Sequence, residues 1–107
     1  MAGNKQFGKN LKRLRESCGL SQETLAELVG LEYQSISRIE TGLYFTSYEN
    51  LIKISKALDV TIKDLFDYQE NVFKEEELRN LINKKLKTLN YSKLELLYNF
   101  VSFLFKI

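Results

Sequence analysis

The chain has 107 residues, which is enough for one domain or for one domain with an appendage. It has no proline and only five glycines, a composition that favours long helices, and its 44% apolar residues are too many for a disordered chain. The single cysteine excludes a multi-cysteine zinc site, and the absence of histidine excludes the commonest general base. The net charge of +2 does not by itself indicate a nucleic-acid partner.

The first predicted helix covers residues 4–17, and its apolar side chains recur at helical spacing as one buried stripe. These side chains are Phe7, Leu11, Leu14 and Cys18. We therefore expect Cys18 to be a buried structural thiol rather than a reactive one. The basic residues of this helix suit a solvated face and a phosphate-binding face equally well.

Two short helices with a glycine between them follow. Ser21 is a good N-cap for a helix over residues 22–29, and Gly30 ends it. The next helix covers about residues 32–41 and is stopped by Gly42.

The helix over residues 32–41 has a narrow apolar side and a broad polar side. Ile36 and Ile39 fall on one side when the segment is wound at about 100° per residue. The opposite arc carries a phenol, an amide, hydroxyls and a guanidinium, from Tyr33, Gln34, Ser37, Arg38 and Thr41. Such a helix is anchored on its narrow side and presents hydrogen-bonding groups outward.

Two further helices complete the first part of the chain. After a loop over residues 43–46, Ser47 caps a fourth helix, and the sequence TIKD at 61–64 resembles a capping box that opens a short fifth helix. The pattern breaks around residues 67–71. We therefore predict one domain over residues 1–69 and a separate C-terminal segment over residues 70–107.

The C-terminal segment is predicted to form two helices. The first, over residues 74–88, is amphipathic, and the second opens with an S-x-x-E capping box made by Ser92 and Glu95. The second helix is apolar almost all round. We predict that it is a dimer interface, which would use Leu94, Leu97, Phe100, Val101, Phe103 and Leu104. The alternative is that these side chains pack within one chain.

The spacing of small and aliphatic residues over residues 22–41 predicts a helix-turn-helix. Ala26 lets two helices approach closely, Gly30 accepts the left-handed conformation of the turn, and Ile36 and Ile39 anchor the second helix. A helix that protrudes in this way fits the major groove of DNA.

The sequence over about residues 7–67 resembles a known family. The segments LKRLRESCGLSQETLAELVGLEYQSISRIETG and YENLIKISKALDVTIKDLF are similar to the Xre-type helix-turn-helix domain of phage repressors and Cro proteins. The resemblance implies an all-α, five-helix lambda-repressor-like domain, followed here by the two C-terminal helices. The chain departs from the family in its loop at 43–46, where proline is often found.

The resemblance also implies roles for individual residues. Gln22 would contact a DNA phosphate, and the family's buried salt bridge would join Arg15 to Glu40. Base edges would face Tyr33, Gln34, Ser37 and Arg38, and backbone phosphates would face Ser35, Thr41 and Tyr44. The chemistry agrees, because glutamine pairs bidentately with adenine and arginine with guanine. Taken singly, Tyr33, Tyr44, Ser35 and Arg38 could also be ordinary surface groups, and Arg15 and Glu40 could be separate surface charges.

We therefore expect a sequence-specific transcriptional regulator, a dimeric repressor that binds double-stranded DNA at an inverted repeat. No catalytic constellation is present, so we expect no enzymatic activity, cofactor or metal. The main alternative is an antitoxin whose C-terminal helices bind a partner protein, and an antirepressor is another type of protein partner. The N-terminus lacks the apolar core of a signal peptide and no segment is long enough to span a bilayer, which predicts a cytoplasmic protein without a membrane partner.

Overall fold

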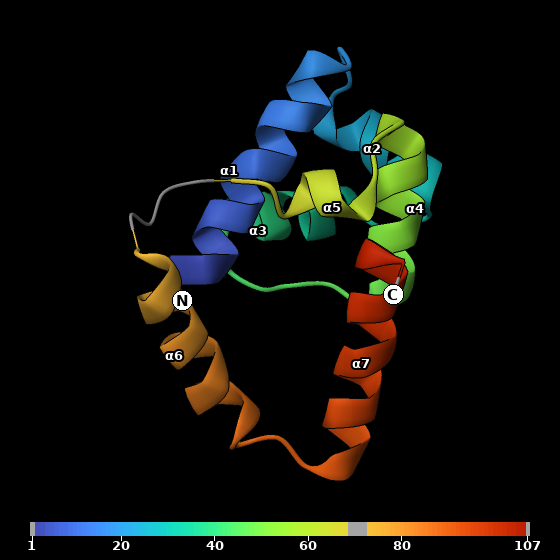
Figure 1. Cartoon of the computed structure of the whole chain (residues 1–107). Coiled ribbons are helices and arrows are strands. Elements are labelled where there is room, and N and C mark those ends of the chain that lie inside the picture. The colour runs from blue at the N-terminus through green and yellow to red at the C-terminus, as the bar shows by residue number, and fades with distance from the viewer. Residues whose placement is uncertain (1, 69–72, 107) are drawn as a thin grey trace. The chain divides into compact units, whose positions relative to one another are not determined.

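The computed structural model describes residues 2–68 and 73–106, which form helices without any strand (Figure 1). The chain separates into two compact units, Met1–Glu70 and Asn71–Ile107. Unit 1 contains α1 (Ala2–Ser17), α2 (Gln22–Val29), α3 (Tyr33–Thr41), α4 (Tyr48–Leu58) and α5 (Ile62–Leu65). Unit 2 contains α6 (Glu75–Leu86) and α7 (Tyr91–Phe105). The all-α fold predicted from the sequence is confirmed.

The helices of unit 1 begin and end at the residues that the capping signals predict. The side chains of Ser21 and Ser47 accept hydrogen bonds from the backbone N–H groups three residues later, at 3.0 Å and 3.2 Å. Thr61 and Asp64 form a complete capping box at the start of α5, and these hydrogen bonds lower the pKa of Asp64 below its usual value. Gly30 and Gly42 end α2 and α3 in the left-handed conformation.

The core of unit 1 lies where α1 packs against α3 and α5, and where α4 packs against α2 and α5. It is formed by Phe7, Leu11, Leu25, Ala26, Val29, Ile36, Ile39, Leu51, Ile54, Leu58 and Leu65. The ring of Phe7 also contacts the rings of Phe45 and Phe66, with centroids 4.9 Å and 5.0 Å away. Unit 1 therefore has a hydrophobic core of its own, with an aromatic cluster at one end.

A buried asparagine, which the sequence patterns did not reveal, joins α1 to α5. The Asn10 side-chain amide donates to the backbone carbonyls of Asp64 at 3.0 Å and Leu65 at 2.8 Å. Arg13 completes the arrangement by donating to the Asn10 side-chain carbonyl at 2.8 Å. Asn10 thus satisfies carbonyl groups at the C-terminal end of α5, where helical partners are lacking.

Two predictions about individual residues are wrong. Cys18 is exposed rather than buried, because α1 ends at Ser17 and the thiol, now in the turn, donates to the carbonyl of Leu58 at 3.4 Å. The N-cap of the last helix is Asn90, which accepts from the backbone N–H of Lys93, and not Ser92. The N-cap therefore lies two residues before the predicted one.

Gly8 marks a close approach between α1 and the C-terminal end of α3. A Cβ atom at Gly8 would lie 2.4 Å from the backbone oxygens of both Ile39 and Glu40, so the two helices would have to separate. We expect Gly8→Ala to lower the free energy of unfolding by about 1–3 kcal/mol, although alanine is the better helix former. Thermal denaturation followed by circular dichroism measures this, with Lys9→Ala on the exposed side of α1 as the control. Equal melting temperatures for the two variants would contradict the close approach.

Unit 2 differs from unit 1 because neither of its helices has a buried residue. The two helices diverge from the turn that joins them rather than packing along their length (Figure 1). Large apolar side chains remain exposed on both helices; they include Leu78, Leu81, Ile82, Leu94, Leu96, Phe103 and Phe105. Unit 2 therefore lacks a core of the kind that unit 1 has.

Candidate nucleic-acid interface

The candidate interface is built on α2, the turn that follows it, and α3. The backbone of Gly30 adopts φ 72° and its N–H reaches back to the last carbonyls of α2, which allows the chain to turn sharply. Ile36 and Ile39 are buried and hold α3 on α1 and α2. Glu40 is the third buried residue of α3, and Tyr33, Gln34, Arg38 and Thr41 remain exposed.

The side chains of the polar arc face solvent to different extents. Tyr33 is 43% exposed, and Gln34, Arg38 and Thr41 are also exposed, whereas Ser35 and Ser37 are half-buried. The Thr41 hydroxyl donates to the Arg38 carbonyl within the same helix. Tyr44, in the loop after α3, is exposed as well. The predicted contact residues other than Gln22 thus lie on α3 and in the loop that follows it.

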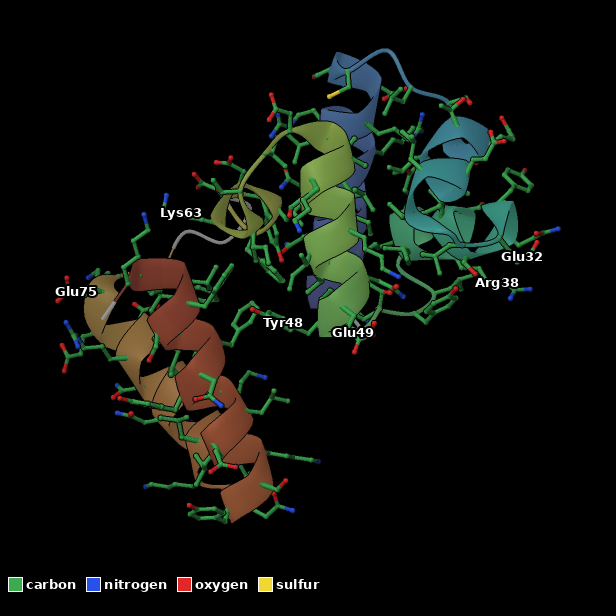
Figure 2. All side chains as sticks on the ribbon, turned by 90° about the vertical axis from the view of Figure 1, so that its right-hand side faces the viewer. Glu32, Arg38, Tyr48, Glu49, Lys63 and Glu75 are labelled. Carbon is green, nitrogen blue, oxygen red and sulfur yellow. The ribbon has the colours of Figure 1, made fainter. Side chains whose placement is uncertain are left out.

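Arg38 projects away from the helices of unit 1, at the same outer edge as Glu32 (Figure 2). Among the described residues, neither Arg38 nor Gln34 makes a side-chain hydrogen bond or ion pair. A guanidinium and an amide in this state have all their donors available to a ligand.

Arg15 and Glu40 form the ion pair that the family resemblance implied. The Arg15 Nε atom donates to Glu40 Oε2 at 2.6 Å and its Nη2 atom donates to Glu40 Oε1 at 3.0 Å, so the pair is bidentate. Only 8% of the arginine side chain and 2% of the glutamate side chain are exposed. The hydrogen bond that Arg15 donates to the Glu40 carboxylate raises the pKa of Arg15 above its usual value, which keeps the buried guanidinium charged.

Two further hydrogen bonds extend this ion pair toward the start of α2. Arg15 Nη1 donates to the backbone carbonyl of Leu20 at 2.7 Å, and Gln22 Nε2 donates to Glu40 Oε1 at 2.9 Å. The network therefore ties the end of α1, the turn before α2 and the end of α3 to one another. The Gln22 amide has two N–H groups, and one of them is bound to Glu40. The second N–H is available for the predicted contact with a DNA phosphate.

The sequence patterns missed Gly8 and the Gln22–Glu40 hydrogen bond, which both act on the end of α3. A glycine inside a helical pattern is a signal of close approach, so Gly8 was detectable. The hydrogen bond had no such signal, because it joins two residues 18 positions apart in the chain.

The described residues contain no group of acidic, cysteine or histidine side chains arranged to hold a metal ion. Within the same part of the chain, no helix has the length and apolar character needed to cross a membrane.

Residues 11–65 match the family described as helix-turn-helix, and the match covers α2, α3, α4 and α5 entirely. The chain is 44% identical over 62 residues to the control protein C.MunI of a Mycoplasma species, across 57% of this chain and 84% of that protein. It is 34% identical over 87 residues to a putative helix-turn-helix transcriptional regulatory protein of Methanocaldococcus jannaschii, across 78% of this chain. The chain spans only 27% of the length of that second protein.

Solved structures show the same likeness. The restriction-modification controller protein C.AhdI of Aeromonas hydrophila superposes with a TM-score of 0.60 at 41% identity, over 62% of this chain and all of that one. The N-terminal DNA-binding domain of SinR from Bacillus subtilis superposes with a TM-score of 0.57 at 32% identity, over 63% of this chain and 99% of that one. Both coverages are close to the share of the chain that unit 1 occupies. The chain belongs to the Xre-type helix-turn-helix family of DNA-binding transcriptional regulators.

Proposed function

We propose that this regulator binds DNA sequence-specifically as a dimeric repressor, with α3 of each copy in the major groove of one half of an inverted-repeat operator. The observation that carries this proposal is the outward polar arc of α3, held in place by two buried isoleucines and by the Arg15–Glu40 pair. In this arrangement Gln34 and Arg38 would read base edges, as would Tyr33 and Ser37. Gln22, Ser35, Thr41 and Tyr44 would contact backbone phosphates.

The proposed dimer forms through unit 2, residues 70–107. The exposed fractions of Leu94, Leu96 and Phe103 are 40%, 61% and 55%, so α7 carries a large apolar surface that one chain leaves in contact with water. A surface of this kind marks a site of association. A second copy of the same helices would cover it, and a closed two-fold dimer is the commonest way in which identical chains associate.

The charges of α6 suit a second copy in an antiparallel orientation. The first turn of α6 holds Glu75, Glu76 and Glu77, and the last turn holds Lys84 and Lys85. When a two-fold axis runs perpendicular to two copies of α6, the two helices are antiparallel. The acidic end of each helix then lies beside the basic end of the other. Charge complementarity of this type favours the correct pairing over others.

Selection of bound duplexes from a random pool, followed by footprinting, tests the proposed function. We expect two copies of one half-site in inverted order, with their centres about 34 Å apart or a multiple of this distance. A footprint over a single unrepeated half-site would contradict the dimer, and a failure to enrich any sequence would contradict sequence-specific binding.

Arg38 and Gln22 are expected to contribute to binding in different ways. Arg38→Ala should weaken binding by about 1–3 kcal/mol and relax the preference at one base pair. Gln22→Ala should weaken binding to all sequences similarly, because a phosphate carries no sequence information, and should leave the dependence on salt nearly unchanged, because the glutamine amide is neutral. Titration of operator variants at several salt concentrations measures both. Equal losses on every sequence for both variants would show that Arg38 only contacts phosphate.

An antitoxin that binds DNA through unit 1 and a partner enzyme through unit 2 is the alternative function. The same exposed apolar side chains on α7 favour it. Self-association of a fragment over residues 70–107 supports the dimeric repressor, whereas a monomeric fragment that binds a co-expressed toxin supports the antitoxin.

A further inference from the structure

Glu32 lies immediately before α3 and does not act as an ordinary N-cap. Its backbone has the extended conformation of an N-cap, with φ −72° and ψ 148°, but its side chain makes no capping hydrogen bond. By contrast, Ser21, Ser47 and Thr61 each accept a hydrogen bond from their own helix. Glutamate is not a favoured N-cap residue, so the sequence begins this helix with a weaker cap than its neighbours have.

The Glu32 carboxylate is exposed and points outward at the edge of unit 1 where Arg38 also projects (Figure 2). Within the described residues it makes no ion pair or side-chain hydrogen bond. The N-terminal end of a helix carries a partial positive charge, which favours an acidic side chain at this position. An acidic side chain without a partner among the described residues therefore stands at the start of the helix that is proposed to enter the major groove.

A carboxylate in the major groove of DNA discriminates strongly between bases. It can only accept hydrogen bonds, so it is repelled by the phosphates and by the acceptor atoms of guanine and of the thymine carbonyl. The groove offers it the amino groups of cytosine and adenine, and cytosine presents its N4 amino group without the N7 acceptor that lies beside the amino group of adenine.

We propose that Glu32 is a specificity-determining residue, whose carboxylate accepts a hydrogen bond from the N4 amino group of a cytosine in each half-site. This inference rests on the proposed function, because it requires α3 to lie in the major groove. Glu32 and Arg38 are six residues apart, and α3 rises about 1.5 Å per residue, so their contacts lie within about 9 Å of each other along the helix. The cytosine is therefore expected within about three base pairs of the base that Arg38 contacts.

The test is selection from a random pool with the full-length wild type, Glu32→Ala and Glu32→Gln, at one salt concentration. The matched control is Glu16→Ala, which removes an exposed carboxylate from α1, opposite the side of that helix that packs in the core. For the wild type, replacing the cytosine should weaken binding by about 5- to 100-fold. Glu32→Ala should lose this preference and keep the others. Glu32→Gln should shift the preference toward adenine, which a glutamine amide recognises bidentately.

The outcomes separate this inference from the proposed function. A wild-type motif with the same cytosine preference in Glu32→Ala and Glu32→Gln would overturn the role of Glu32 and leave the proposed function intact. A wild type that enriches no motif would overturn both. Circular dichroism shows whether each variant is folded, and Glu32→Gln, which keeps the size of the side chain, serves as the test if Glu32→Ala is not. The Glu16→Ala motif should match that of the wild type, and a loss of cytosine preference in this control would assign the effect to net charge alone and contradict the proposal.

Discussion

Truncation after Gln69 is expected to lower the apparent affinity for a two-half-site operator by about two to four orders of magnitude. The reason is that two unit 1 domains joined through unit 2 bind the second half-site as an intramolecular event, and separate domains lose this effective concentration. The truncated chain should still fold, because the buried residues that form the core all lie between Phe7 and Leu65. Its base preference within one half-site should not change.

Titration of one-half-site and two-half-site duplexes with both chains measures this effect, and sedimentation equilibrium gives the oligomeric state. Val101→Asp and Phe103→Asp in the full chain should dissociate the dimer, because each places a charge in the proposed apolar interface. Ser92→Asp, on an exposed part of α7, is the matched control and should remain dimeric. A full chain that is monomeric at micromolar concentration, or a truncated chain that still dimerises, would show that unit 2 is not the dimer interface.

Glu40→Ala is expected to lower the free energy of unfolding by about 3–5 kcal/mol. The substitution leaves the Arg15 guanidinium buried without its bidentate partner, and it also removes the acceptor of the Gln22 hydrogen bond. The N-terminal end of α2 and the C-terminal end of α3 would then lose their common attachment. We therefore expect weaker DNA binding as well, although Glu40 is buried and has no proposed contact with DNA.

Chemical denaturation of Glu40→Ala, Arg15→Ala and the double variant Arg15→Met/Glu40→Leu measures the contribution of the pair. The double variant should recover much of the lost stability, because two apolar side chains leave no unpaired buried charge. The exposed Arg79–Glu75 pair, at 3.5 Å on α6, is the comparison, and Glu75→Ala should change stability little. Unchanged unfolding of both single variants of the buried pair would show that it does not stabilise the fold.

Several parts of the proposed DNA interface could be predicted from the sequence because they depend on local signals. Ser21 and Gly30 bound α2 through contacts within a few residues, and the period of Ile36 and Ile39 determines which side of α3 is buried. The position of Asn10 in the packing could not be predicted in this way. Asn10 binds carbonyls 54 and 55 positions away, and such contacts leave no periodic pattern in the chain.

The sequence by itself determined the helices of unit 1, their order and the family, because capping residues and helical periodicity are local properties. The errors at Cys18 and Ser92 also have a local origin, since the apolar pattern of α1 continues past the end of the helix at Ser17, and both Asn90 and Ser92 are suitable N-cap residues. Only the tertiary structure decided that Gln22 joins the Arg15–Glu40 pair and that Glu32 leaves its carboxylate free of the helix. The physical reason is that a polar side chain bonds to the partner that lies at a suitable distance and angle in the folded chain. That distance and angle depend on how α1, α2 and α3 pack together.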